Sequence, residues 1–162
     1  MGRELTPQQA GWVFEHWVCE SFRLVADRAD RVRGPFTVRM DASERTKEEV
    51  DGLVTLGWQG FLIQSKFESE PTSFEPIARL YLQVGRRPEG TIGLFFSRLY
   101  SEAAEELAAE LRPIRVLLFR IEEIEWALIS EPPLDMVEVV RRKWRLALES
   151  AIPGRDLRMY VE

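Results

Sequence analysis

The fold predicted from the sequence depends on the stretch VDGLVTLGWQGFLIQSK, residues 50–66. Two apolar runs rich in β-branched residues, 50–56 and 61–66, flank a tetrapeptide that begins and ends with glycine. This pattern is typical of two adjacent antiparallel strands joined by a tight turn. The rest of the chain is interpreted outward from this hairpin.

The hairpin places three polar side chains near one another. If Trp58 and Gln59 form the tip of the turn, Asp51 lies opposite Lys66. Side chains alternate between the two faces of a strand, so Asp51, Gln64 and Lys66 are expected on one face. Directly opposed residues have Cβ atoms about 5 Å apart. A carboxylate, an amide and an ammonium group are therefore predicted to converge at one end of the hairpin.

Length and composition indicate one ordinary folded domain. The chain has 162 residues, enough to bury a core, and its hydrophobic and charged fractions are those of a globular protein. We expect a single domain over 1–162, with a core at about 6–120 and a C-terminal helical extension at about 121–162. No apolar run is long enough for a membrane span, and the start lacks the apolar stretch of a signal peptide, so a cytoplasmic protein without membrane contact is expected.

The residue types restrict the metals that the chain could bind. Cys19 is the single cysteine and His16 the single histidine, which argues against disulfides and against zinc sites built from thiolates or imidazoles. Any metal would be a hard cation held by oxygen, such as magnesium, manganese or calcium.

The net charge of −5 argues against general binding of polyanions. Contact with nucleic acid would need a local basic patch or a partner protein. One basic stretch follows the first expected helix, and another lies around Trp144; in both, solvated arginines are the favoured interpretation and phosphate contact is the alternative. The candidate nucleic-acid contacts are Arg28, Arg33, Arg39, Arg86 and Arg87.

The first helix has clear start signals. Thr6 is a good N-cap, Pro7 suits the first helical position, and Gln9 completes a capping box. An apolar stripe with helical spacing follows, and Glu15 lies at its margin. Such a carboxylate can reach the edge of a core or a cleft, although a solvent-exposed glutamate is the alternative.

Further elements alternate between strands and helices. We expect strands at 36–40, 91–97 and 114–120, a polar loop at 41–49, helices at 73–84, 101–111 and 135–150, and a short helix or strand at 122–130. A strand–helix–strand–helix–strand order after a hairpin favours an α/β (α+β) fold: a central mixed β-sheet flanked by helices on both faces.

Three motifs, in order along the chain, resemble the PD-(D/E)XK nuclease superfamily, and within it the Mrr-type restriction endonucleases. The sequence GWVFE at 11–15 resembles the Gly-x-x-Phe-Glu pattern of the first helix, VDGL at 50–53 the strand that bears the metal-binding aspartate, and IQSK at 63–66 the Gln-x-Lys variant of the acid-x-Lys signature. The segments GLFFS at 93–97 and SEAA at 101–104 resemble the following strand and helix. The resemblance spans roughly residues 10 to 120 and implies a restriction-endonuclease-like fold.

The resemblance implies roles for these residues. Asp51 would be the principal ligand of Mg²⁺ (or Mn²⁺), with Glu15 binding directly or through water. Gln64 would offer its side-chain oxygen, and the backbone of Ile63 or Ser65 could add another ligand. Lys66 would orient or deprotonate the attacking water and stabilise the developing charge. This donor set suits magnesium, which needs only one or two carboxylates and keeps several waters.

Gln64 departs from the usual superfamily pattern, in which an acid occupies this position. The site then has one negative charge fewer and should hold a metal more weakly. Glu49, Glu68 and Glu70 share the face parity of the three polar side chains and are candidates to compensate.

The leading functional hypothesis is a metal-dependent endonuclease that hydrolyses DNA, with RNA as the alternative substrate, in bacterial restriction or anti-phage defence. It would act as a homodimer or as a subunit of a larger defence complex. The alternative is a catalytically inactive nuclease-like domain that binds a protein partner or nucleic acid.

Overall fold

A five-stranded mixed sheet forms the centre of the protein. The computed structural model describes residues 5–24, 31–39 and 47–160. The strand order is β1-β4-β5-β6-β7; β1, β4 and β5 pair antiparallel, and β5, β6 and β7 pair parallel. These strands are β1 (Arg31–Arg33), β4 (Gly52–Leu56), β5 (Gln59–Lys66), β6 (Ile92–Ser97) and β7 (Val116–Arg120).

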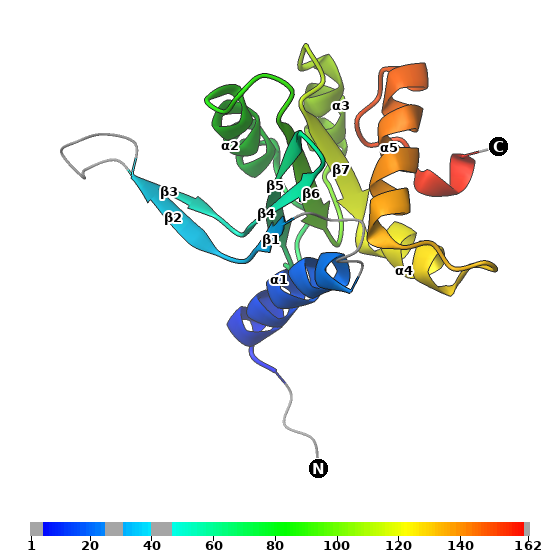
Figure 1. Ribbon diagram of the computed structural model, residues 1–162, viewed down its shortest axis with the longest axis horizontal. Helices are drawn as coiled ribbons and strands as arrows, with labels where there is room; N and C mark the ends of the chain where they lie inside the picture. The colour runs from blue at the N-terminus through cyan, green and yellow to red at the C-terminus, as the bar shows by residue number, and fades with distance from the viewer. Residues whose placement is uncertain (1–4, 25–30, 40–46, 161–162) are drawn as a thin grey trace.

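Helices cover both faces of this sheet (Figure 1). One face packs against α1 (Pro7–Arg23), α4 (Ile121–Ile129), α5 (Met136–Ser150) and the short 3₁₀ helix η1 (Leu157–Met159). The other face packs against α2 (Phe74–Gly85) and α3 (Glu102–Glu110). The predicted fold class, a central mixed sheet flanked by helices on both faces, is therefore confirmed.

Strand alternation divides the core into two layers. On β5, Phe61 and Ile63 are buried in the layer with α1, and Leu62 is buried in the layer with α2. On β6, Phe96 is buried in the layer with α1, and Phe95 is buried in the layer with α2. Odd-numbered residues of β5 therefore face α1, and even-numbered residues, including the two polar ones at its end, face α2.

The hairpin register differs from the prediction by two residues. Leu56 pairs with Gln59, and Gly52 pairs with Ile63, so the turn has Gly57 and Trp58 at its tip. Gly57 has φ of +62°, a conformation that favours glycine at the first position of a two-residue hairpin turn. The expected pairing of Asp51 with Lys66 is therefore wrong. Because the error is an even number of residues, Gln64 and Lys66 still lie on the predicted face of β5, whereas Asp51 lies between β3 and β4, outside both strands.

Two short polar strands were not predicted. β2 (Phe36–Arg39) agrees with the expected strand, but it pairs with β3 (Lys47–Val50), which begins inside the expected loop 41–49; residues 41–46 of that loop lie outside the described residues. The β2–β3 pair forms a separate two-stranded sheet that projects from the body (Figure 1). Similarly, residues 31–33 were expected in a solvated loop but form β1, paired with β4. Backbone pairing, which leaves no apolar pattern in the sequence, accounts for both differences.

The basic run 141–145 is more deeply packed than expected. Lys143 is fully buried, and its Nζ lies 2.6 Å and 2.8 Å from the two carboxylate oxygens of Glu123 on α4. Burial lowers the pKa of Lys143, opposed by the adjacent charge of Glu123. Trp144 packs partly against the core. The segment 122–130, left open between helix and strand, is helical as part of α4.

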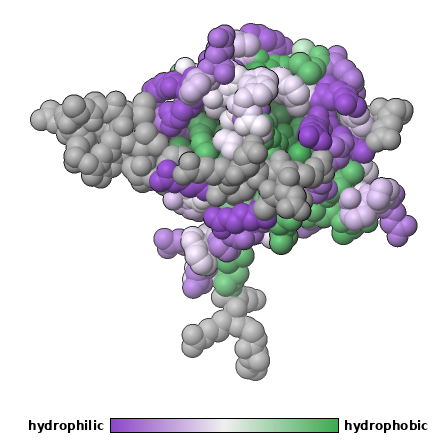
Figure 2. Space-filling model, viewed as in Figure 1, coloured by the Kyte–Doolittle hydropathy of each residue, from purple (hydrophilic) through white to green (hydrophobic). Residues whose placement is uncertain are grey.

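Figure 2 shows hydrophilic residues along much of the outline of one face of the molecule, with hydrophobic patches among them. In the described ranges, no helix is both long enough and apolar enough to cross a membrane.

Candidate functional site

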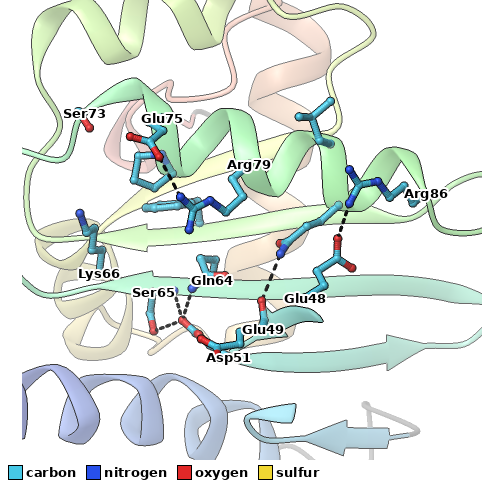
Figure 3. A pocket seen from close by; sticks show the side chains of 14 residues that line it. Glu48, Glu49, Asp51, Gln64, Ser65, Lys66, Ser73, Glu75, Arg79 and Arg86 are labelled. Atoms are coloured by element: carbon cyan, nitrogen blue, oxygen red, sulfur yellow. Dashed lines mark hydrogen bonds and ion pairs between the residues drawn. The ribbon is translucent and has the colours of Figure 1, made fainter. Parts of the chain in front are cut away.

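Asp51 is the centre of a hydrogen-bonded cluster at the end of the hairpin. It lies between β3 and β4, and its Oδ2 accepts hydrogen bonds from Gln64 Nε2 at 2.8 Å, from the Ser65 backbone N–H at 2.7 Å and from Ser65 Oγ at 3.1 Å (Figure 3). All three bonds end on Oδ2, and among the described residues none ends on Oδ1. One carboxylate oxygen is thus held in place, and the other is left for a further ligand.

Gly52 allows helix α1 to approach this cluster. A Cβ atom at position 52 would lie 2.8 Å from Cys19 Sγ and 3.3 Å from Ile63 Cβ, too close for any other residue without a shift. Cys19 Sγ in turn lies 3.7 Å from the carbonyl oxygen of Asp51. The glycine of the VDGL motif is therefore needed for close packing between α1 and the strand that follows Asp51.

The close approach of α1 places Glu15 within electrostatic reach of Asp51. Burial raises the pKa of Glu15, and the negative charge of Asp51 raises it further. Burial also raises the pKa of Asp51; hydrogen bonds from Ser65 and Gln64 oppose that shift, and the charge of Glu49 adds to it. Burial and neighbouring negative charge thus favour the protonated form of both carboxyl groups.

Two open cavities lie on either side of the end of β5. The first, of about 560 Å³, is lined by Asp51, Gln64 and Lys66 together with residues of α2 such as Arg79. The second, of about 820 Å³, is lined by Glu15 with other residues of α1. Ser65 and Lys66 line both cavities. The structure therefore brings Asp51, Gln64 and Lys66 to one cavity, as predicted, and Glu15 to the adjacent one.

Lys66 does not contact Asp51 directly. Its Nζ lies 3.0 Å from Glu68 Oε2, and its side chain is 33% exposed. Figure 3 shows Lys66 on the α2 side of β5, whereas Ser65 points toward Asp51. A group bound in the first cavity could be reached by both Lys66 and Asp51, but the two side chains do not pair with each other.

Oxygen donors of the kind that magnesium and manganese prefer lie near Asp51, but they are few. Within the described ranges, no group of three or more His, Cys, Asp or Glu side chains is placed to hold a metal. The oxygen donors at hand are Oδ1 of Asp51, the carboxylate of Glu15, the amide oxygen of Gln64 and the nearby backbone. One or two carboxylates suffice for Mg²⁺, which keeps several waters. The Gln64 amide, however, presents nitrogen to Asp51, so it would have to turn to offer oxygen to the same cation.

Two of the predicted nucleic-acid contacts already have an acidic partner. Arg86 Nη1 lies 3.0 Å from Glu48 Oε1, and Arg87 Nη2 contacts Glu48 Oε2. Arg33 has an exposed side chain on β1. Arg28 lies outside the described residues, as does the side chain of Arg39. Of the three arginines whose side chains the structure describes, two are therefore paired with Glu48.

Sequence reasoning missed three contributions to the site. Ser65 was considered only for its backbone, yet both its N–H and its Oγ hold Asp51. The contact of Cys19 with the Asp51 carbonyl could not be read from helical spacing alone. Glu48 lay in an expected loop, so its buried position was not anticipated, and no local sequence pattern marks it.

Comparisons with known proteins concern the fold. No protein-family model matches the sequence, and no curated protein is detectably similar to it. A solved structure described as a protein of unknown function, AF1548, aligns at a TM-score of 0.51 and 14% identity, covering 85% of this chain and 77% of that one. This similarity supports a shared overall fold.

Two restriction endonucleases align more loosely. The MspJI restriction endonuclease, solved with a 27-mer oligonucleotide, matches at a TM-score of 0.41 and 23% identity, over 66% of this chain and 25% of that one. The DNA modification-dependent restriction endonuclease AspBHI matches at 0.43 and 17%, over 86% and 35%. The chain thus spans about a quarter to a third of these enzymes, and alignments this loose carry no argument about activity.

Proposed function

We propose that this protein is a divalent-cation-dependent endonuclease that hydrolyses phosphodiester bonds of DNA, with Asp51 as the principal metal ligand. The observation that supports this most directly is the placement of Asp51, Gln64 and Lys66 around one cavity, with Glu15 lining the adjacent cavity and near enough for the charge of Asp51 to raise the pKa of the Glu15 carboxyl. The order of the three sequence motifs, which resemble those of PD-(D/E)XK nucleases of the Mrr type, supports the same interpretation.

Each residue has a distinct task in this proposal. Asp51 Oδ1 and Glu15 would hold Mg²⁺ or Mn²⁺, and the Gln64 oxygen and the Ile63 or Ser65 backbone would complete the protein ligands. A bound cation would neutralise the phosphate and lower the pKa of a water. Ser65 fixes the carboxylate of Asp51 through two hydrogen bonds. Lys66 would orient the attacking water and stabilise charge on the phosphate, once released from Glu68.

The second candidate is a nuclease-like domain without activity that binds a protein or a nucleic acid. Two contacts favour it: the Gln64 amide already donates a hydrogen bond to Asp51 as a neutral donor, and Lys66 is already paired with Glu68. Such a cluster is complete without a cation, as expected where a catalytic acid has been replaced.

A cleavage assay across metals distinguishes the two candidates. Wild type, Asp51→Ala and Lys66→Ala are compared on DNA and on RNA with Mg²⁺, Mn²⁺ or Ca²⁺. The enzyme hypothesis predicts cutting by wild type with Mg²⁺ or Mn²⁺ and loss in both variants. Equal cutting by all three proteins would assign the activity to a contaminant, and intact substrates throughout would favour the binding domain.

We also propose that the enzyme acts in restriction or anti-phage defence, as a homodimer or within a larger complex. Cutting both strands of a duplex needs two active sites, and each chain offers one cluster of this kind among its described residues. Sedimentation in the presence of duplex DNA and Ca²⁺ would show whether two copies assemble on one substrate.

A further inference from the structure

Glu48 is a buried acid three residues before Asp51. Only 5% of Glu48 is exposed, and its two carboxylate oxygens each meet a guanidinium group, from Arg86 and from Arg87. Arg86 is the C-cap of α2, and Arg87 follows it directly. The side chain of Glu48 thus fastens β3 to the end of α2. We call Glu48, Gln83, Arg86 and Arg87 the Glu48 cluster.

Gln83 fastens the next residue of the same strand. Its Nε2 donates a hydrogen bond of 3.2 Å to the carbonyl oxygen of Glu49. The Glu49 carbonyl determines the orientation of the Gln83 amide, because the reversed amide would place Gln83 Oε1 against the Glu49 carbonyl oxygen. Gln83 is only 5% exposed, and its Oε1 has no hydrogen-bond partner in the described part of the chain. An unsatisfied buried acceptor costs free energy. A contribution to stability alone therefore does not explain the hydrogen bond of Gln83 with Glu49.

The two residues that follow are also held, each by a different element. Val50 is buried in the core layer of α2. The carbonyl of Asp51 meets Cys19 on α1, and its carboxylate meets β5. Each of the four successive residues 48–51 is therefore held by contacts with other elements, and the last of them is the proposed metal ligand. Figure 3 shows Glu48, Glu49 and Asp51 following one another along this edge of the cavity.

The side chain of Arg86 is 51% exposed, whereas that of Arg87 is only 18% exposed, so the pair of Glu48 with Arg87 is the largely buried one. A buried ion pair is a weak source of stability, because removing two charges from water costs free energy comparable to what their attraction returns. Apolar side chains could have joined β3 to α2 at a smaller cost. The charged and amide contacts differ from apolar packing in that they fix direction and distance, which is what a metal ligand requires of its supports.

We propose that the Glu48 cluster positions Asp51, so that Glu48 is a positioning residue for the metal-binding carboxylate. The metal-binding role of Asp51 in this inference rests on the proposed function. Whether Glu48 positions the Asp51 carboxylate can be tested without metal or substrate. It also assigns Arg86 and Arg87 to the support of the site, in place of the phosphate contacts expected from the sequence.

The Ser65 backbone N–H provides the readout, because its acceptor is Asp51 Oδ2. The ¹⁵N-labelled, metal-free full chain is compared as wild type, Glu48→Ala, Glu48→Gln and the control Glu105→Gln. Glu105 is a suitable control because it forms a partly buried ion pair with Arg120 between α3 and β7, and neither residue lines either cavity around Asp51. The chemical shift and hydrogen exchange of the Ser65 amide are measured, followed by calorimetric titration with Mn²⁺.

We expect Glu48→Ala to shift the Ser65 amide signal, speed its exchange and weaken Mn²⁺ binding about tenfold. Glu48→Gln keeps an acceptor for the arginines and should fall between Glu48→Ala and wild type; it also serves if the alanine variant does not fold. Glu105→Gln should match wild type in both readouts.

An unchanged Ser65 amide in folded Glu48 variants would overturn the inference, as would an unchanged Mn²⁺ affinity where wild type binds. If wild type neither binds Mn²⁺ nor cuts DNA, the proposed function fails, and the Ser65 amide still decides the role of Glu48.

Discussion

Gln64 donates a hydrogen bond from Nε2 to Oδ2 of Asp51 over 2.8 Å. In the PD-(D/E)XK pattern that the sequence resembles, an acid would stand at position 64 and two carboxylates would face each other. The amide replaces that repulsion with an attraction. The site is therefore more stable without metal, and its affinity for a cation should be lower than with an acid at position 64.

Restoring the acid at position 64 should reverse both effects. In Gln64→Glu, the second carboxylate would repel Asp51 in the metal-free protein and add a charged ligand in the metal-bound one. We expect a lower melting temperature without metal and Mn²⁺ or Mg²⁺ binding tighter by about tenfold, or about 1.4 kcal/mol. Calorimetry and thermal melts with and without Mn²⁺ measure this. An affinity equal to that of wild type would show that position 64 does not face the cation.

Lys66 should affect chemistry more than metal binding. Because its Nζ pairs with Glu68 and not with Asp51, Lys66→Ala should leave Mn²⁺ affinity within about twofold of wild type. Cleavage should fall by about 10²–10⁴-fold, the usual contribution of a group that transfers protons. Single-turnover cleavage rates and calorimetry on the same preparation separate the two effects. Glu68→Gln is the matched variant, and it should keep activity because it only releases the lysine. Loss of metal binding in Lys66→Ala would contradict this assignment.

The raised pKa values of Asp51 and Glu15 predict a particular pH dependence. Burial raises both, so the ionised carboxylates destabilise the metal-free fold. Stability from these groups is present below their unfolded pKa, about 4, and is lost as the pH rises through the higher folded values. Asp51→Asn, which cannot ionise, should therefore be more stable than wild type at pH 7, by on the order of 1 kcal/mol. Urea unfolding without metal should show this gain at pH 7 and its disappearance at pH 3; a loss of stability at pH 7 would contradict it.

Gly52 should tolerate no larger side chain. In Gly52→Ala the new Cβ would meet Cys19 Sγ at 2.8 Å, forcing α1 away from the strand that follows Asp51. We expect a loss of about 1–3 kcal/mol in the free energy of unfolding. Gly11→Ala provides the contrast: Gly11 lies inside α1 with nothing within 4 Å of a new Cβ, so about 0.5–1 kcal/mol should be gained. Equal stabilities for the two variants, measured by urea unfolding, would show that α1 does not pack closely at Gly52.

Much of the fold could be predicted because its central strands and helices have strong local patterns. The apolar run that forms β6 indicated a strand buried on both faces, and the capping box of Thr6 and Gln9 is present at the start of α1. The polar strands β1 and β3 could not be predicted in this way. Their residues pair through the backbone, and their side chains carry no period that distinguishes a strand from a loop.

The outline of the candidate site could be predicted although the strand register was wrong. An error of two residues in register leaves the side chains of a strand on the same face. Placing the turn at Trp58 and Gln59, one position from its true place at Gly57 and Trp58, shifted the pairing by two residues and put Lys66 opposite Asp51, yet Gln64 and Lys66 still line the cavity with Asp51. The contacts that decide the details join distant parts of the chain. Neither the buried pair of Lys143 with Glu123 nor that of Glu48 with Arg87 leaves a mark in local sequence, because each depends on how helices pack.

The central claim is that Asp51 holds a divalent cation, and the direct measurement is a calorimetric titration of Mn²⁺ into wild type and into Asp51→Asn at neutral pH. The claim predicts one binding event per chain in wild type and its loss in a variant that is folded and at least as stable. Binding of equal stoichiometry and affinity in both proteins, or binding in neither, would contradict it.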